Sequence, residues 1–201
     1  MLRKSLYRPE IDGLRAFAVI AVIINHFNKD ILPGGYLGVD IFFVISGYVI
    51  TSSLLKRPNE NFKDFIIGFY ERRIKRLIPA LALYVIIISI LIHLFIQNAG
   101  GYYKMGVLSL FGLSNLHIVS LVGGYWGFQA SMNPFTQTWS LGVEEQFYFL
   151  FPLLAWFSGF ARKDKFGVRN LFLLSGFLAT ISCLAFISFY STNPAATYFL
   201  M

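Results

Sequence analysis

Long apolar runs, separated by short polar segments, extend along the whole chain. Each run approaches the length of about 20 residues that a helix needs to cross the hydrocarbon core of a bilayer. The pattern therefore predicts an all-α, polytopic bundle of transmembrane helices with five to six membrane segments. The runs cover residues 14–27, 36–55, 77–96, 105–122, 139–159 and 168–190.

Residues 56–76, between the second and third runs, follow a different pattern. Their apolar side chains recur at helical spacing among many charged ones, which is typical of an amphipathic helix at a membrane surface. We expect a basic amphipathic helix that continues into the third run. Its apolar positions are Phe62, Phe65, Ile66, Phe69 and Ile74.

The composition agrees with a membrane protein. The chain of 201 residues is 56% hydrophobic and 13% charged, whereas in soluble domains about a quarter of the residues are charged. The net charge of +7 would suit a nucleic-acid partner. However, the basic residues lie between the apolar runs, so membrane topology explains them better and no nucleic acid is expected. The single cysteine, Cys183, excludes an intrachain disulfide and is expected to be a packing residue.

Lys and Arg residues gather in three places: four up to Arg15, seven in residues 56–76 and four in residues 162–169. Because cytoplasmic loops are enriched in these residues, we expect all three places, including the N-terminus, on the cytoplasmic side. This orientation requires that the run 105–122 does not cross the membrane. We expect a re-entrant or shallow pair of short helices there. A full crossing that breaks the charge rule once is the alternative.

The first run carries two polar side chains eleven residues apart, Arg15 and His26. A helix rises about 1.5 Å and turns about 100° per residue, so these residues lie roughly 16 Å apart and nearly on one stripe. Ionisable groups in a membrane helix indicate a functional site. The charge topology places Arg15 near the inner surface and His26 near the outer one.

A glycine-rich stretch, residues 33–40, follows His26 and ends at Asp40. Its glycines permit a tight turn and a close approach of two helices. A neutral histidine can take a proton from a hydroxyl group, and a carboxylate can fix its tautomer, so His26 and Asp40 form a candidate pair. The alternatives are a histidine that only packs at the helix end and an aspartate bound to arginine or backbone groups.

Two adjacent carboxylates, Glu144 and Glu145, lie in the fifth run, where an unpaired charge is costly. Ser140, Glu144 and Tyr148 follow at intervals of four residues and share a helix face. We expect Glu144 to face a polar cavity, with Glu145 pointing about 100° away. A purely structural anchor for neighbouring helices is the alternative.

A basic motif precedes the third run and contains Arg72, Arg73 and Arg76. These arginines are near neighbours on a helix, and guanidinium groups bind phosphate through paired hydrogen bonds. A cytoplasmic anchor that binds anionic lipid is the alternative. The other two histidines, His93 and His117, are interpreted as structural. The sequence has no metal-ligand cluster, P-loop or dinucleotide fingerprint.

Five motifs in order resemble the acyltransferase-3 family of membrane acyltransferases, which modify bacterial surface glycans. They are residues 7–19, Arg15 with His26, and residues 38–48, 72–79 and 138–148. The resemblance implies an enzyme of the bacterial cytoplasmic membrane. It would transfer an acyl group, acetyl by default, from an acyl-CoA co-substrate to a hydroxyl of a cell-surface glycan or glycolipid. No tightly bound cofactor is expected.

The resemblance also implies roles for individual residues. Arg15 and the three arginines of the basic motif would hold the phosphates of the donor, and His26 would be the general base, oriented by Asp40 or Glu144. Negative charge that develops on the acyl oxygen needs a hydrogen-bond donor. The candidates for that donor are Asn25, Trp139 and Ser140.

Two features depart from the family pattern. Gln137 stands where the family often has a histidine, directly before Thr-Trp-Ser-Leu, so His26 would have to act without that residue. The membrane domain of the family also has more spans than this chain, so we expect residues 1–201 to be the N-terminal part of a larger, truncated acyltransferase-3 domain. The alternatives to an active acyltransferase are an inactive truncated relative and a transporter or flippase of an acyl or glycan intermediate.

Overall fold

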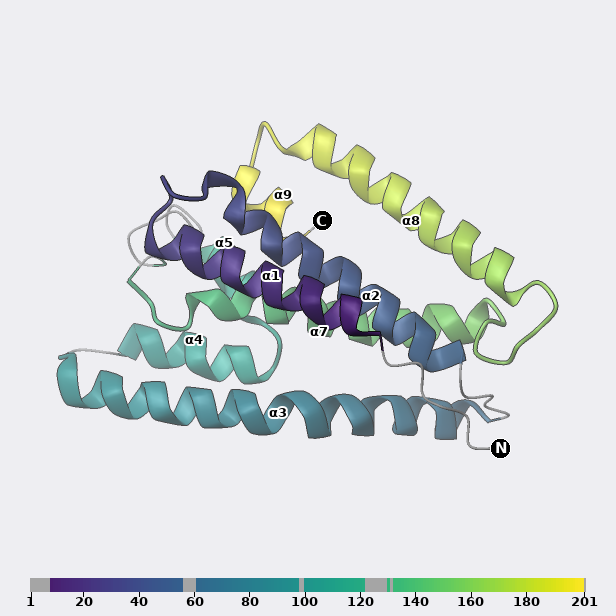
Figure 1. Cartoon of the computed structure of the whole chain (residues 1–201), viewed down its shortest axis with the longest axis horizontal. Coiled ribbons are helices and arrows are strands. Elements are labelled where there is room, and N and C mark those ends of the chain that lie inside the picture. The colour runs from purple at the N-terminus through teal and green to yellow at the C-terminus, as the bar shows by residue number, and fades with distance from the viewer. Residues whose placement is uncertain (1–7, 56–60, 98–99, 122–129, 131, 201) are drawn as a thin grey trace. The chain divides into compact units, whose positions relative to one another are not determined.

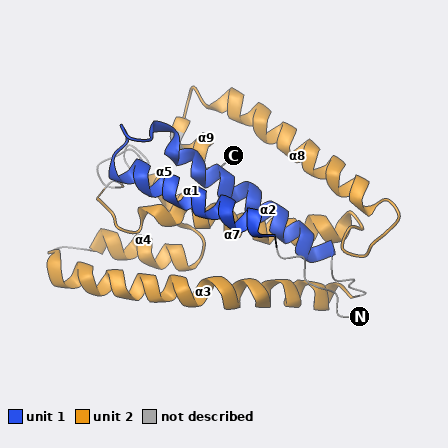
Figure 2. Cartoon of the chain, in the orientation of Figure 1, with its two compact units in different colours: residues 1–57 blue, residues 58–201 orange. Residues whose placement is uncertain are grey.

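The computed structural model describes residues 8–55, 61–97, 100–121, 130 and 132–200. In these ranges the chain forms helices, turns and coil, without a β-strand. The chain divides into two compact units, residues 1–57 and 58–201 (Figure 2). Unit 1 and unit 2 are described separately below.

Unit 1 is a helical hairpin. Helix α1 (Pro9–Phe27) leads through the 3₁₀ helix η1 (Pro33–Leu37) into α2 (Gly38–Leu55), and all three elements pack on one another (Figure 1). Pro9 occupies the first turn of α1, where its missing N–H costs nothing because that group would have no helical acceptor.

Two glycines let the hairpin close. A Cβ at Gly35 would lie 2.3 Å from the carbonyl oxygen of Ala21, and a Cβ at Gly38 would lie 2.5 Å from that of Ala18. Both alanines are buried. The prediction that the glycines permit a close helix approach is therefore confirmed, because a larger residue at either position would force the two backbones apart.

Unit 2 begins with α3 (Phe62–Phe95), a single helix of 34 residues. The side chain of Asn61 caps it by accepting a hydrogen bond from the Lys63 N–H at 3.0 Å. The predicted amphipathic helix does continue into the third apolar run, and the two form one helix. Its first turns bury Phe65, whose ring centroid lies 5.5 Å from that of Trp156.

The fourth apolar run is broken into two short helices. Helix α4 (Gly100–Leu110) and α5 (Ser114–Ser120) are joined by a turn at Gly112, whose φ of +66° suits glycine. Helices of 11 and 7 residues are shorter than the length of about 20 residues needed to cross a bilayer. The expected pair of short helices is thus confirmed, whereas their depth in the membrane stays a prediction.

The centre of unit 2 is α7 (Trp139–Phe157), which follows the 3₁₀ turn η3 (Thr136–Thr138). Helix α7 contacts α3, α4 and α5, and also α8 (Gly167–Phe189) and α9 (Pro194–Leu200) (Figure 1). Side chains on several faces of α7 therefore meet other elements. This position makes α7 the scaffold of the candidate site in unit 2.

Three helical segments of the described chain are long and apolar enough to cross a membrane: Pro33–Leu55, Phe62–Phe95 and Gly167–Phe189. Only 6% of the apolar window of the last segment is buried inside the protein, so most of its side chains suit contact with lipid. A helical membrane bundle agrees with the predicted fold class. The expected total of five to six membrane segments and the cytoplasmic N-terminus stay predictions.

Candidate functional site

Helix α1 carries Arg15 and His26 on one continuous helix, as the spacing predicts. Eleven helical steps separate the two residues by roughly 16 Å along the axis. Arg15 is partly exposed, and its Nη1 atom lies 3.4 Å from Oδ1 of Asp12. The two residues are one helical turn apart, and the carboxylate of Asp12 is exposed. An ion pair of this kind contributes little to stability.

His26 is exposed in the last turn of α1, and its Nδ1 atom lies 2.9 Å from the carbonyl oxygen of Val22. A carbonyl oxygen can only accept a hydrogen bond, so Nδ1 must carry the proton. In the neutral imidazole the lone pair is therefore on Nε2, the atom that can act as a base. The sequence suggested that a carboxylate fixes the tautomer of His26, whereas in the structure a backbone carbonyl of α1 does so.

Asp40 lies in the first turn of α2 and is exposed. Because α1 and α2 form a hairpin, the C-terminal end of α1 and the N-terminal end of α2 lie at the same end of unit 1. His26 and Asp40 are therefore at one end of the hairpin. The role of Asp40 beside His26 stays a prediction.

Asn25 is buried between α1 and the turn that follows it. Its Nδ2 atom donates to the carbonyl oxygens of Leu32 at 2.9 Å and Pro33 at 3.2 Å. The amide group therefore stabilises the turn beside His26. To serve as an oxyanion donor, as the sequence analysis suggests, Asn25 would have to release one of these bonds.

In unit 2, helix spacing brings Glu144 and Tyr148 together, as predicted. The Tyr148 hydroxyl donates a hydrogen bond of 2.8 Å to Oε2 of Glu144. The guanidinium of Arg73 lies over the Tyr148 ring at 5.2 Å and over the Phe69 ring at 5.5 Å. A residue of the basic motif and a residue of the fifth run are thus joined through one tyrosine.

The three arginines of the basic motif are not equivalent. Arg73 is partly buried against the two rings, whereas Arg72 and Arg76 are exposed on α3. The two rings lie within cation–π distance of the Arg73 guanidinium. These contacts restrict the side chain of Arg73 more than those of its exposed neighbours, which is an advantage for binding an anion.

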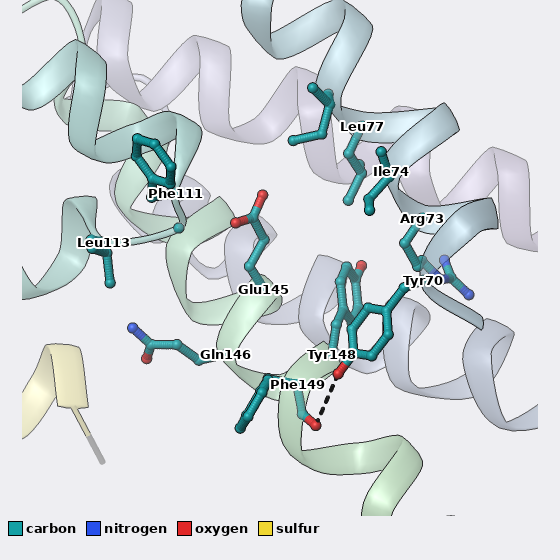
Figure 3. A pocket seen from close by; sticks show the side chains of 12 residues that line it. Tyr70, Arg73, Ile74, Leu77, Phe111, Leu113, Glu145, Gln146, Tyr148 and Phe149 are labelled. Carbon is teal, nitrogen blue, oxygen red and sulfur yellow. Dashed lines mark hydrogen bonds between the residues drawn. The ribbon is translucent and has the colours of Figure 1, made fainter. Parts of the chain in front are cut away.

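A cavity of about 440 Å³ lies between α3, the turn at Gly112 and α7 (Figure 3). The helix face shared with Ser140 and Tyr148 predicts that Glu144 faces a polar cavity. This cavity, whose lining is mostly apolar, is lined by Glu145 and not by Glu144. The reason is the turn at Gly112, because a Cβ there would lie 2.2 Å from Oε2 of Glu145. A glycine between two helical segments often marks a close approach to the backbone, but its partner Glu145 follows only from the tertiary structure.

The residues at the start of α7 are packed rather than open. Trp139 is buried, and its ring centroid lies 5.8 Å from that of Tyr198 in α9. The hydroxyl of Ser140 donates to the Gln137 carbonyl oxygen at 3.4 Å. Both side chains contain a hydrogen-bond donor and therefore remain candidates for binding the oxyanion. That role stays a prediction.

Gln137, at the position where the family often has histidine, is bound to α3. Its Nε2 atom donates to the Tyr84 hydroxyl at 2.5 Å, and that hydroxyl donates to the Pro134 carbonyl oxygen at 2.6 Å. Tyr84 has one proton and gives it to a carbonyl, so it must accept from the amide nitrogen of Gln137. The network holds the segment before α7 against α3.

A pair of amides, absent from the sequence analysis, joins α5 to α7. Asn115 is fully buried, and it exchanges two hydrogen bonds with Gln146, of 3.2 Å and 3.0 Å. A Cβ at Gly142 would lie 2.9 Å from Oδ1 of Asn115, so glycine is needed for this contact. An amide in an apolar segment is the signal that marks such a pair, but its partner follows only from the tertiary structure.

The remaining histidines fit structural roles. His117 contacts the Ser120 hydroxyl at 3.2 Å through Nδ1, and burial, with a smaller contribution from Lys104, lowers the pKa of its imidazole. His93 is exposed near the end of α3. Within the described residues, His, Cys, Asp and Glu form no group that could hold a metal ion.

The candidate residues thus form two groups. Unit 1 contains Arg15, Asn25, His26 and Asp40, and unit 2 contains the basic motif, Trp139, Ser140 and Glu144. Within unit 2 the structure brings Arg73 and Glu144 together through Tyr148. The pairing of His26 with Glu144 stays a prediction, since the two residues belong to different units.

Comparison with known proteins adds an independent observation. The family model described as Acyltransferase domain matches residues 8–201. The chain is also 38% identical over 194 residues to the O-acetyltransferase OatA of Staphylococcus aureus strains NCTC 8325 / PS 47 and COL. The matched part is 96% of this chain and 32% of each relative, so the chain spans about a third of the length of these curated relatives. No solved structure matches the chain.

The family match begins at the N-cap of α1 and extends through every described helix. It includes the helix with Arg15 and His26, the basic motif of α3 and the paired glutamates of α7. The helical fold, the order of the motifs and the extent of the match agree, and the chain therefore belongs to the acyltransferase-3 family.

Proposed function

We propose that this protein is an integral membrane O-acyltransferase of the bacterial cytoplasmic membrane. It moves an acyl group, most simply acetyl, from an acyl-CoA donor to a hydroxyl of a cell-surface glycan or glycolipid. The family match and the O-acetyltransferase name of the S. aureus relatives support this reaction class. The observation that carries the proposal is His26, whose Nδ1 is bound to a backbone carbonyl on the same helix as Arg15.

The donor is held through its phosphates. Arg15 and the arginines of the basic motif supply the cations, and among the latter Arg73 lies beside two aromatic rings. Guanidinium groups bind phosphate oxygens through charge-assisted hydrogen bonds. The arm that bears the thioester then extends along α1, and the roughly 16 Å between Arg15 and His26 suits its extended form.

The reaction at His26 is a general-base acyl transfer. Nε2 takes the proton of the acceptor hydroxyl as its oxygen forms a bond to the acyl carbon. The carbon–sulfur bond of the thioester then breaks, and the departing thiolate takes the proton back from the imidazolium. Asp40 or Glu144 stabilises the imidazolium, and Asn25, Trp139 or Ser140 donates to the acyl oxygen while it is negatively charged.

The test is acetyl transfer by membranes that contain the protein. With radiolabelled acetyl-CoA and a cell-wall glycan acceptor, a His26→Ala protein should lose at least about 100-fold in rate, since general-base catalysis contributes roughly 10²–10⁴-fold. His93→Ala, which alters an exposed histidine near the end of α3, is the matched control and should keep the wild-type rate. A His26→Ala protein with full activity would sink the proposal.

The same assay separates the enzyme from a carrier. A transporter or flippase would move an acyl or glycan intermediate without forming a new ester. Label recovered in an alkali-labile ester on the glycan supports the acyltransferase. Label that crosses the membrane but stays on its original carrier contradicts it.

A further inference from the structure

The cavity of unit 2 has mostly apolar walls and few polar groups. Its apolar lining comes from α3 and from the turn between α4 and α5, and includes Leu77, Ile78 and Phe111. The polar side chains among the lining residues are those of Tyr70, Arg73, Glu145, Gln146 and Tyr148. Its volume of about 440 Å³ is within the range of about 300–1,000 Å³ typical of ligand sites.

The carboxylate of Glu145 points into this cavity. Figure 3 shows it between Phe111 on one side and the α3 side chains Ile74 and Leu77 on the other. Among the described residues of unit 2, no side chain or backbone group donates a hydrogen bond to it. Glu145 is partly buried, and its carboxyl oxygens are hydrogen-bond acceptors, so a donor group on a ligand in the cavity could bind them.

The side chain of Glu145 packs closely against the backbone of the turn at Gly112. Its Oε2 atom occupies the space that a Cβ at position 112 would fill, because such a Cβ would lie 2.2 Å away. Glu144, the preceding residue, is already bound to the Tyr148 hydroxyl at 2.8 Å. The two adjacent glutamates therefore differ: Glu144 is tied to the protein, and Glu145 is presented to the cavity.

The charges of the lining restrict the ligand. A phosphate beside Glu145 would be repelled by the carboxylate, and a second cation would be repelled by Arg73, which lines the same cavity. A sugar, with a hydroxyl on nearly every carbon, suits the apolar side chains that make up most of the lining less well than an apolar chain does. The group that fits is a neutral N–H or O–H donor on an otherwise apolar, extended chain.

We propose that Glu145 is a donor-recognition residue that accepts a hydrogen bond from an amide N–H or hydroxyl of the acyl donor's pantetheine arm. This inference rests on the proposed function, which supplies an acyl-CoA donor. The arm contains amide groups, a hydroxyl and methyl groups in one flexible chain, which matches the mixed lining of the cavity. Arg73, which lines the same cavity, is then placed for an anionic part of the donor.

Binding of two probes to the purified protein in lipid nanodiscs tests this role. Desulfo-coenzyme A has the phosphates and the arm, whereas adenosine 3′,5′-bisphosphate has phosphates without the arm. In Glu145→Leu the affinity for desulfo-coenzyme A should fall about tenfold, the loss expected for one hydrogen bond to a charged group. Its affinity for adenosine 3′,5′-bisphosphate should not fall, because the leucine removes a carboxylate that repels phosphate and no group that binds it.

Two further variants make the result specific. Glu145→Gln keeps a carbonyl acceptor and should lose less affinity for desulfo-coenzyme A than the leucine variant does. Asp64→Asn removes an exposed carboxylate from the first turn of α3, outside the cavity, and should bind both probes like wild type. Leucine in place of an unpaired carboxylate in an apolar site is expected to fold, and thermal unfolding checks this.

The outcomes separate the inference from the proposed function. If wild type binds desulfo-coenzyme A and Glu145→Leu binds it equally well, the role of Glu145 is wrong while the acyl-CoA donor stands. If the affinity of the leucine variant falls equally for both probes, Glu145 does not recognise the pantetheine arm. If wild type binds neither probe, the acyl-CoA donor itself is wrong.

Discussion

The turn beside His26 depends on a glycine that no other residue can replace without moving a helix. A Cβ at Gly35 would lie 2.3 Å from the Ala21 carbonyl oxygen, 0.7 Å inside the 3.0 Å below which Cβ atoms are essentially never found. It would also lie 2.7 Å from the Cβ of Asn25. Gly35→Ala therefore forces the turn away from α1 at the position of the histidine.

The cost follows from these contacts. Overpacking of a close backbone contact costs about 1–3 kcal/mol, and displacement of the turn removes at least one hydrogen bond of Asn25, worth about 1 kcal/mol. We therefore expect the hairpin to lose about 2–4 kcal/mol of local stability, which raises its opening by about 30- to 700-fold. Acetyl transfer should fall as well, because the backbone around His26 moves.

Gly34→Ala is the matched control. It lies in the same 3₁₀ helix, but the nearest atom to its added Cβ is Cδ1 of Leu37 at 3.9 Å. Both variants gain equally from the lower entropy of the unfolded chain, so their difference isolates the contact. Hydrogen exchange of the amides at the end of α1 and in η1, followed by mass spectrometry, measures the opening. Equal exchange in the two variants would refute the reasoning.

Two further predictions concern unit 2. Tyr148→Phe keeps the ring beneath Arg73 but removes the 2.8 Å bond to Glu144, so unfolding by chemical denaturant should show a loss of about 1 kcal/mol. Tyr70→Phe, which removes only an exposed hydrogen bond of 3.3 Å, is the control. If both variants lose the same free energy of unfolding, the bond between Tyr148 and Glu144 has no special role in stability. Burial lowers the pKa of His117, so the unfolded chain binds its proton more readily and stability should fall as the pH drops below about 6.5. His117→Asn should reduce this dependence, and an unchanged pH profile would argue against it.

The sequence by itself was sufficient for features that depend on local geometry. The helical period places Arg15 and His26 on one helix and Glu144 one turn before Tyr148, because these relations involve only residues of a single helix. The break near Gly112 was also predictable, since glycine with neighbouring polar residues is poorly suited to a continuous membrane helix. The order of the motifs likewise indicated the family, because a motif consists only of residue types and their spacing along the chain.

Only the tertiary structure decided the surroundings of polar residues that are adjacent in the sequence. Glu145, and not Glu144, lines the cavity because the backbone of Gly112, more than thirty positions away, leaves space for its carboxylate. Arg73 differs from Arg72 because the ring of Tyr148 covers it. Helical geometry sets the direction of a side chain around its own helix, but the groups that this side chain meets are brought there by helix packing, which depends on residues distant in the chain.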